Sequence, residues 1–103
     1  MNNTIKFSTN WNNKLNCNYF TTIRLMSKKY QVSKIFNIEL KNQHHCKSIV
    51  VNMIYLKLND LNDFNCYLDT GYSVDETKNI FKKMYPEINF EVTNLSIILL
   101  KKL

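Results

Sequence analysis

The sequence predicts an α+β fold, in which a small mixed β-barrel or curled sheet of about five to six strands packs against one short and one longer helix. Three observations carry this prediction. Several segments alternate apolar and polar residues with the period of a half-buried strand. One late segment has both the start and the stop signals of a helix. A length of 103 residues suits a single domain, which we expect to span residues 1–103.

The first half of the chain is rich in predicted strands. "TIKFST" at 4–9 reads as a short strand, and "NWNNKLNCNY" at 10–19 as a short helix with Trp11 and Leu15 on one side. Residues 20–26 are rich in Thr, Ile and Phe, which favours a strand. "KIFNIELK" at 34–41 alternates cleanly, and "SIVVNMIYLKL" at 48–58 predicts a central strand.

The second half contains the best-marked helix. "NDLNDFN" at 59–65 reads as a turn with at most one helical turn. In "SVDETKNIFKKMYP" Ser73 and Glu76 have the spacing of a capping box, and Pro86 ends the helix. "INFEV" at 88–92 and "LSIILLKK" at 95–102 then supply one or two closing strands. With one glycine in the chain, we expect the sixteen asparagines to make many of the turns.

Composition excludes several classes of protein. The chain is 45% hydrophobic and 13% aromatic, as folded globular proteins are. No apolar run reaches the length of a membrane span, and "MNNTIKFS" does not resemble a signal peptide, so we expect a cytoplasmic protein without a membrane partner.

Cys17, Cys46 and Cys66 lack the spacing of a disulfide framework, and "HHC" at 44–46 lacks zinc-ligand spacing. We therefore expect no metal and no cofactor.

Positive charge belongs to one half of the chain. Residues 1–51 hold eight basic residues and one acid, a net charge of +7, whereas residues 52–103 hold six basic and seven acidic residues, a net charge of −1. Such asymmetry favours a face that contacts polyanions such as RNA. An ordinary lysine-rich, solvated surface is the alternative.

Arg24 is the single arginine in a chain with thirteen lysines. On a strand over 20–26, side chains alternate, so Thr22 and Arg24 share one face at a distance of roughly 7 Å. A hydroxyl beside a planar guanidinium suits a phosphate or a base edge. The alternative is a solvated strand face on which Arg24 pairs with a nearby carboxylate.

Aromatic residues are interleaved with the basic ones near this strand. Bases stack on aromatic rings while lysines follow the phosphate backbone. Trp11 and Phe20 fit the core better than a stacking role. The predicted nucleic-acid-binding residues are Arg24, Lys14, Lys28, Lys29, Lys34, Tyr19 and Tyr30.

These segments resemble the ASCH domain, a small PUA-like β-barrel family. "FTTIRL" is similar to the T-x-R strand of the family, "YQVSKIFNIEL" to its turn leading into a strand, and "SVDETKNIFKKMYP" to its late helix ending in Tyr-Pro. The likeness runs from about Phe7 to Leu100. It implies a PUA-like barrel that binds RNA or modified nucleobases in a cleft beside the strand.

One bacterial branch of the ASCH family hydrolyses N4-acetylcytidine, and the resemblance places Thr22 on its nucleophile and Arg24 on its arginine. The lysine expected three residues before the threonine is Tyr19 here, and Ser33 and Lys34 replace the Gly-Asp of the family's turn. A threonine without an adjacent base is a poor nucleophile. The catalytic acid would fall near "LDTGYS", on Thr70 or Asp69 depending on where a gap is placed, and Asp69 is either a general base or an ordinary turn carboxylate.

Three functions follow as hypotheses. The first is a noncatalytic RNA- or nucleotide-binding module that uses a basic face and a Thr22/Arg24 cleft. The second is a phage-type counter-defence inhibitor, similar to an anti-CRISPR protein, that binds a nuclease ribonucleoprotein or its guide RNA. The third is an N4-acetylcytidine amidohydrolase with Thr22 and Asp69 as catalytic residues. We expect a monomer.

Overall fold

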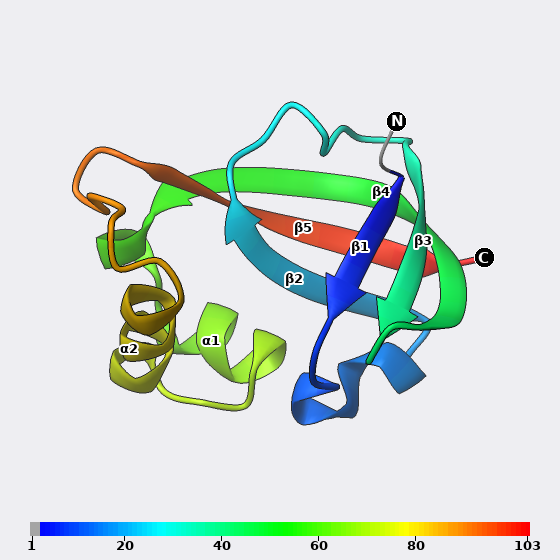
Figure 1. Ribbon diagram of the computed structural model, residues 1–103, viewed down its shortest axis with the longest axis horizontal. Helices are drawn as coiled ribbons and strands as arrows, with labels where there is room; N and C mark the ends of the chain where they lie inside the picture. The colour runs from blue at the N-terminus through cyan, green and yellow to red at the C-terminus, as the bar shows by residue number, and fades with distance from the viewer. Residues whose placement is uncertain (1–2) are drawn as a thin grey trace.

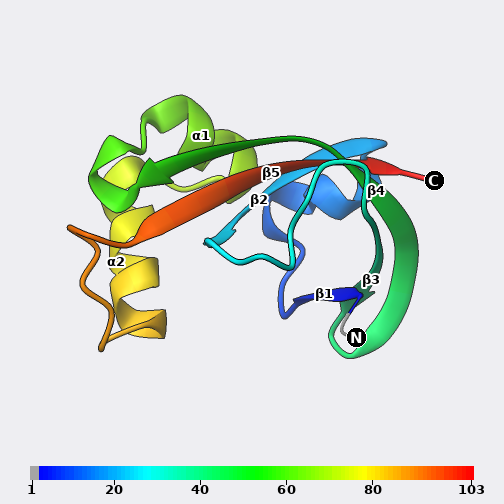
Figure 2. The ribbon, with the colours of Figure 1, turned by 90° about the horizontal axis from the view of Figure 1, so that it is seen from above.

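The computed structural model describes residues 3–103 and confirms a small α+β domain (Figure 1). Its five strands form one sheet that curls into a half-barrel, as the view from above shows (Figure 2). The strands are β1 (Thr4–Phe7), β2 (Tyr19–Leu25), β3 (Ile35–Leu40), β4 (Gln43–Lys57) and β5 (Asn94–Lys102).

The strand order is β1-β3-β4-β5-β2. β1 pairs with β3 in parallel, and every other pair is antiparallel. β4 is 15 residues long, and its pairing shifts register at Ile38/Glu39 of β3 and at Val50/Asn52. Because β-bulges bend a strand, these irregularities let β4 curl and carry β1 round towards β2, the other edge of the sheet.

The two faces of the sheet bury two separate cores. On the concave face, Phe20, Phe36 and Ile98 belong to a cluster that β1 covers. On the convex face, Ile23, Leu95 and Ile97 pack against residues of the helical segments, which include Leu61, Cys66 and Phe81. Adjacent residues of β2 and β5 therefore contribute to different cores, as the alternation of strand side chains requires.

The helix predicted from the capping box is α2 (Val74–Met84). The Ser73 hydroxyl accepts a hydrogen bond from the Glu76 backbone N–H at 3.2 Å and donates one to the Glu76 carboxylate at 3.0 Å. Lys82 and Lys83 lie in the last turn, where positive charge is favourable, and the helix ends one residue before the Tyr85–Pro86 pair.

Two other segments differ from the sequence-based prediction, and a third settles an alternative that the sequence left open. The short helix predicted at 10–19 is a 3₁₀ segment, η1 (Trp11–Asn16), interrupted by left-handed Asn12 and Asn13. The turn predicted at 59–65 contains η2 (Leu58–Asp60) and the start of α1 (Asp63–Asp69), whose Asn62 cap accepts a hydrogen bond from the Asn65 N–H. Of the one or two closing strands predicted over 88–102, the structure has one, β5, and residues 88–92 form turns before it.

Within residues 3–103, no helix combines the length and the apolar character needed to cross a membrane.

Candidate functional site

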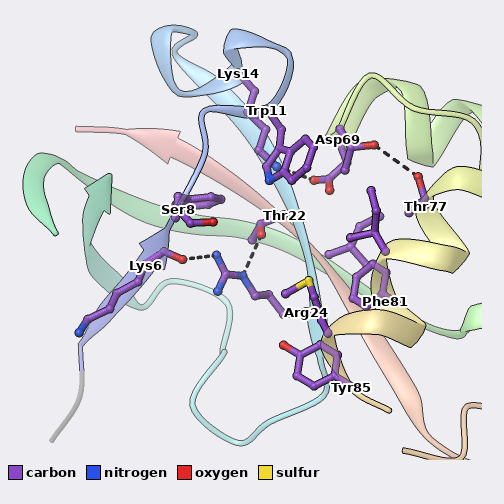
Figure 3. A pocket seen from close by; sticks show the side chains of 15 residues that line it. Lys6, Ser8, Trp11, Lys14, Thr22, Arg24, Asp69, Thr77, Phe81 and Tyr85 are labelled. Carbon is purple, nitrogen blue, oxygen red and sulfur yellow. Dashed lines mark hydrogen bonds and ion pairs between the residues drawn. The ribbon is translucent and has the colours of Figure 1, made fainter. Parts of the chain in front are cut away.

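A pocket of about 120 Å³ opens at the edge of β2, between β1, η1 and the two α-helices (Figure 3). Its polar lining groups come from five separate segments of the chain, and they include Ser8, Lys14, Thr22, Arg24, Asp69 and Thr77. Phe7, Trp11, Phe81 and Tyr85 supply aromatic walls. Polar groups that converge between apolar and aromatic walls are typical of a ligand site.

Arg24 joins the two edge strands of the sheet. Its Nε donates to the Thr22 hydroxyl at 3.0 Å, and its Nη2 donates to the Lys6 carbonyl of β1 at 2.8 Å. The guanidinium carbon also lies 4.7 Å from the centre of the Phe7 ring. Figure 3 shows the guanidinium between β1 and β2, with the Lys6 side chain pointing away. A fork-shaped donor is needed here because a lysine ammonium lacks the planar geometry to make all three contacts.

Thr22 lies in the pocket wall with its side chain buried. Its hydroxyl oxygen accepts the bond from Arg24, which orients the hydroxyl, and its own proton remains to be donated. The two predicted cleft residues thus share one face of β2, as the alternation indicated. The structure adds one feature that the sequence did not predict: the two side chains are hydrogen-bonded to each other.

Lys14 and Asp69 form a buried ion pair, with 2.8 Å between Lys14 Nζ and Asp69 Oδ1. Thr21 donates a further hydrogen bond to the same carboxylate oxygen at 3.1 Å. Burial lowers the pKa of the Lys14 ammonium and raises the pKa of the Asp69 carboxyl, and the attraction between the two groups opposes both shifts. A buried pair of this kind contributes little net stability, since desolvation offsets the Coulomb gain.

The burial of this ion pair bears on two predictions made from the sequence, one for Lys14 and one for Asp69. Lys14, predicted to follow an RNA backbone from the surface, is buried inside the pocket lining. Asp69, for which a turn or solvated carboxylate was one alternative, is the last residue of α1 and buried. Lys14 lies eight residues before Thr22 in sequence, yet η1 brings its ammonium into the same pocket. Its sequence position carried no signal of this placement.

The other predicted binding residues lie away from this pocket. Lys29 Nζ donates to the Thr4 carbonyl at 2.6 Å, and Lys34 Nζ donates to the Lys29 carbonyl at 3.0 Å. Tyr30 packs against the concave core, with its ring centre 5.9 Å from that of Phe36. Lys28 and Tyr19 are exposed. Lysines that satisfy backbone carbonyls have fewer donors left for phosphates.

Sequence reasoning missed two aromatic residues of the site. Phe7 lies under both cations, since Lys14 Nζ is 5.3 Å from its ring centre and Arg24 is closer still. Tyr72 packs edge-on against Trp11 at 5.4 Å and holds the indole at the pocket. Residues 4–9 were predicted as a short strand, but no local pattern indicated the two cationic neighbours of Phe7.

The histidine and cysteine side chains do not gather in one place. His45 Nε2 bonds to the Leu15 carbonyl at 2.8 Å, and His44 is exposed. Among residues 3–103, no three His, Cys, Asp or Glu side chains are grouped so that they could hold a metal ion.

Comparison of the chain with models of protein families, with curated proteins and with solved structures finds no match.

Proposed function

We propose that the chain is a noncatalytic, ASCH-like module that binds RNA or a nucleotide by inserting one base into the Thr22/Arg24 pocket. The observation that carries the proposal is the hydrogen-bonded Thr22–Arg24 pair in the wall of a pocket with aromatic sides. The curled five-stranded sheet and its late helix also support it, because the sequence resemblance implies a small PUA-like barrel.

The chemistry of the pocket suits a nucleobase. Trp11 and Tyr85 line the pocket with their rings partly exposed, and stacking on such rings contributes about 1 to 3 kcal/mol per base. The Thr22 hydroxyl and the remaining guanidinium N–H groups of Arg24 can meet carbonyl oxygens and ring nitrogens on a base edge. Unpaired bases are the usual target of sequence-specific RNA recognition, since their edges are accessible.

A titration of a short fluorescent single-stranded RNA tests this proposal. We expect binding that weakens as salt rises, because exposed lysines such as Lys28 contact phosphates. Thr22→Val keeps the shape of the side chain but removes the hydroxyl, and it should weaken binding about tenfold or more. Thr93→Val makes the same exchange outside the pocket and should bind as the wild type does. Absence of binding even at low salt would refute the proposal.

A second candidate function is hydrolysis of N4-acetylcytidine, and the Lys14–Asp69 pair is the observation that favours it. Thr22 Oγ1 would attack the acetyl carbonyl carbon, and the C–N bond would break as N4 of cytidine takes a proton. Water would then release acetate and restore the threonine hydroxyl. The carboxylate of Asp69, whose pKa burial raises, is suited to accept the threonine proton and return it in these steps, with the Lys14 ammonium holding that carboxylate in place.

Acetate release separates the two candidates. An enzyme would release acetate from N4-acetylcytidine, and both Thr22→Ala and Lys14→Met would abolish the release. A binding module would bind cytidine-containing RNA without any release of acetate, whatever the incubation time.

A further inference from the structure

Part of the convex sheet face is left without cover. Ile23, Ile97 and Ile54 lie in register across β2, β5 and β4, on the face opposite the concave core. Their side chains are 6%, 8% and 50% exposed. Residues of the helical segments therefore cover the β2 and β5 side of this face and leave the β4 side open.

The uncovered region is apolar and basic. We call it the open sheet face and define it by Ile35, Ile49, Ile54, Lys47 and Lys101. The pairing places Ile35 opposite Ile49, and Ile49 opposite Lys101, so the residues form a row across three strands. The water-facing side of an antiparallel sheet is normally polar. Ile35 and Ile54 are exposed and Ile49 between them is half-buried, and exposed β-branched residues on this side indicate a surface that is buried in an assembly.

A second uncovered surface lies on α1. Phe64, Tyr67 and Leu68 stand at the i, i+3 and i+4 positions of the helix, so they lie on one side of it, and all three are exposed. Phe64 is 79% exposed, the highest value among the large hydrophobic residues described. Asp60 and Asp63, both exposed, lie beside this stripe in sequence. We call the three residues the α1 stripe.

We propose that two copies of the chain form a dimer in which the α1 stripe of each covers the open sheet face of the other. Both surfaces contribute apolar side chains, so their association removes apolar area from water. Their charges are complementary, since Asp60 and Asp63 lie at the N-terminal side of the stripe while Lys47 and Lys101 belong to the open sheet face. This proposal departs from the monomer expected from the sequence.

A two-fold axis satisfies both contacts at once. α1 lies on the convex side of the sheet, the side on which the open sheet face lies (Figure 2). In an isologous interface, residue i of one copy contacts residue j of the other, and j contacts i. Two copies related in this way make the same contact twice and leave neither surface free for a third copy.

Sedimentation equilibrium of the purified chain over a wide range of concentrations tests the dimer. We expect a species of twice the 12.3 kDa chain mass. Leu68→Lys places a cation against the two lysines and should raise the dissociation constant at least about tenfold. Val92→Ser is the matched control, because Val92 is exposed but lies outside both surfaces. A chain that stays monomeric at every concentration would overturn the proposal.

Exchange of charges tests the pairing of the two surfaces. Asp63→Lys and Lys101→Asp should each weaken the dimer, and the double variant should recover it, with circular dichroism confirming that each variant is folded. A double variant no tighter than the single ones would show that α1 and the open sheet face do not meet. Growth beyond two copies would contradict the two-fold arrangement and indicate a head-to-tail contact instead.

Discussion

Thr22 and Arg24 show that the alternation of side chains along a strand can predict part of a functional site. The strand 20–26 placed Thr22 and Arg24 on one face, and that part of the site was predictable from alternation alone. The Lys14–Asp69 pair was not predictable, because its members are 55 residues apart in sequence and meet only through the packing of α1 near η1. Arg24 likewise has a contact in β1 that no local pattern indicates.

Arg24→Lys tests whether the arginine is needed for its geometry and not only for its charge. The lysine keeps the cation but loses the bond from Nε to Thr22 and the fork that reaches the Lys6 carbonyl. We expect the free energy of unfolding in urea to fall by about 1 to 2 kcal/mol. Lys28→Ala, at an exposed position, should change it by less than about 0.5 kcal/mol. Equal stability of wild type and Arg24→Lys would show that charge alone suffices.

The Lys14–Asp69 pair is tested by a double-mutant cycle. Lys14→Met and Asp69→Leu each leave one buried, unpaired charge, so each should cost about 3 to 5 kcal/mol of stability. The double variant should recover much of this loss, since it buries no charge. If it recovers stability but loses binding or catalysis, the pair is retained for function. Additive losses in the cycle would contradict a direct interaction.

Asp69 also predicts a dependence of stability on pH. Burial raises its pKa above the ordinary value of 3.8, so between 3.8 and the pKa of the folded state the folded chain holds a proton that the unfolded chain has released. The contribution of Asp69 to the free energy of unfolding must therefore decrease as pH rises through that window. Urea unfolding at a series of acidic pH values should show this decrease in the wild type and lack it in Asp69→Asn. The same slope in both proteins would be evidence against a raised pKa.

Among the elements, those with local signals were predicted best. α2 was predictable because Ser73, the acidic first turn and Pro86 mark its two ends within one short segment. α1 was not, because its asparagine-rich start is also typical of turns. The asparagines behave as expected in the turns, since Asn12, Asn13 and Asn42 all take positive φ. The sequence left open whether 88–92 forms a strand of its own, because alternation in a short segment does not reveal whether a partner strand is free.

The N-terminal cap of α2 should contribute to the stability of the fold and, through α2, to ligand binding. Ser73→Ala removes the hydroxyl that accepts from the Glu76 N–H, and it should lower stability by about 1 kcal/mol. Because α2 lines the pocket through Thr77 and Phe81, ligand binding should weaken as well. Asn79→Ala, exposed in the middle of the same helix, serves as the control and should leave stability unchanged or raise it. Thermal unfolding of the three proteins measures the difference.

Across the whole molecule, acidic and basic residues are distributed unevenly between the helical segments and the sheet. All the acids except Glu39 lie between residues 60 and 91, in the helical segments and the loop that follows them, while most lysines lie on the half-barrel. The uneven distribution of charge along the sequence therefore gives the molecule one acidic end and one basic end. The pocket lies between them, at the edge of β2, and the proposed dimer would bring unlike ends together.

Insertion of a base into the pocket is tested most directly by chemical-shift mapping on the ¹⁵N-labelled chain during titration with a short unlabelled single-stranded RNA. We predict that the largest shifts occur at the amides of Thr22 and Arg24, at the Trp11 indole N–H and along the pocket side of α2. Smaller, salt-sensitive shifts should occur at exposed lysines such as Lys28. Shifts confined to exposed lysines, with the pocket resonances unchanged, would contradict insertion of a base between β2 and α2.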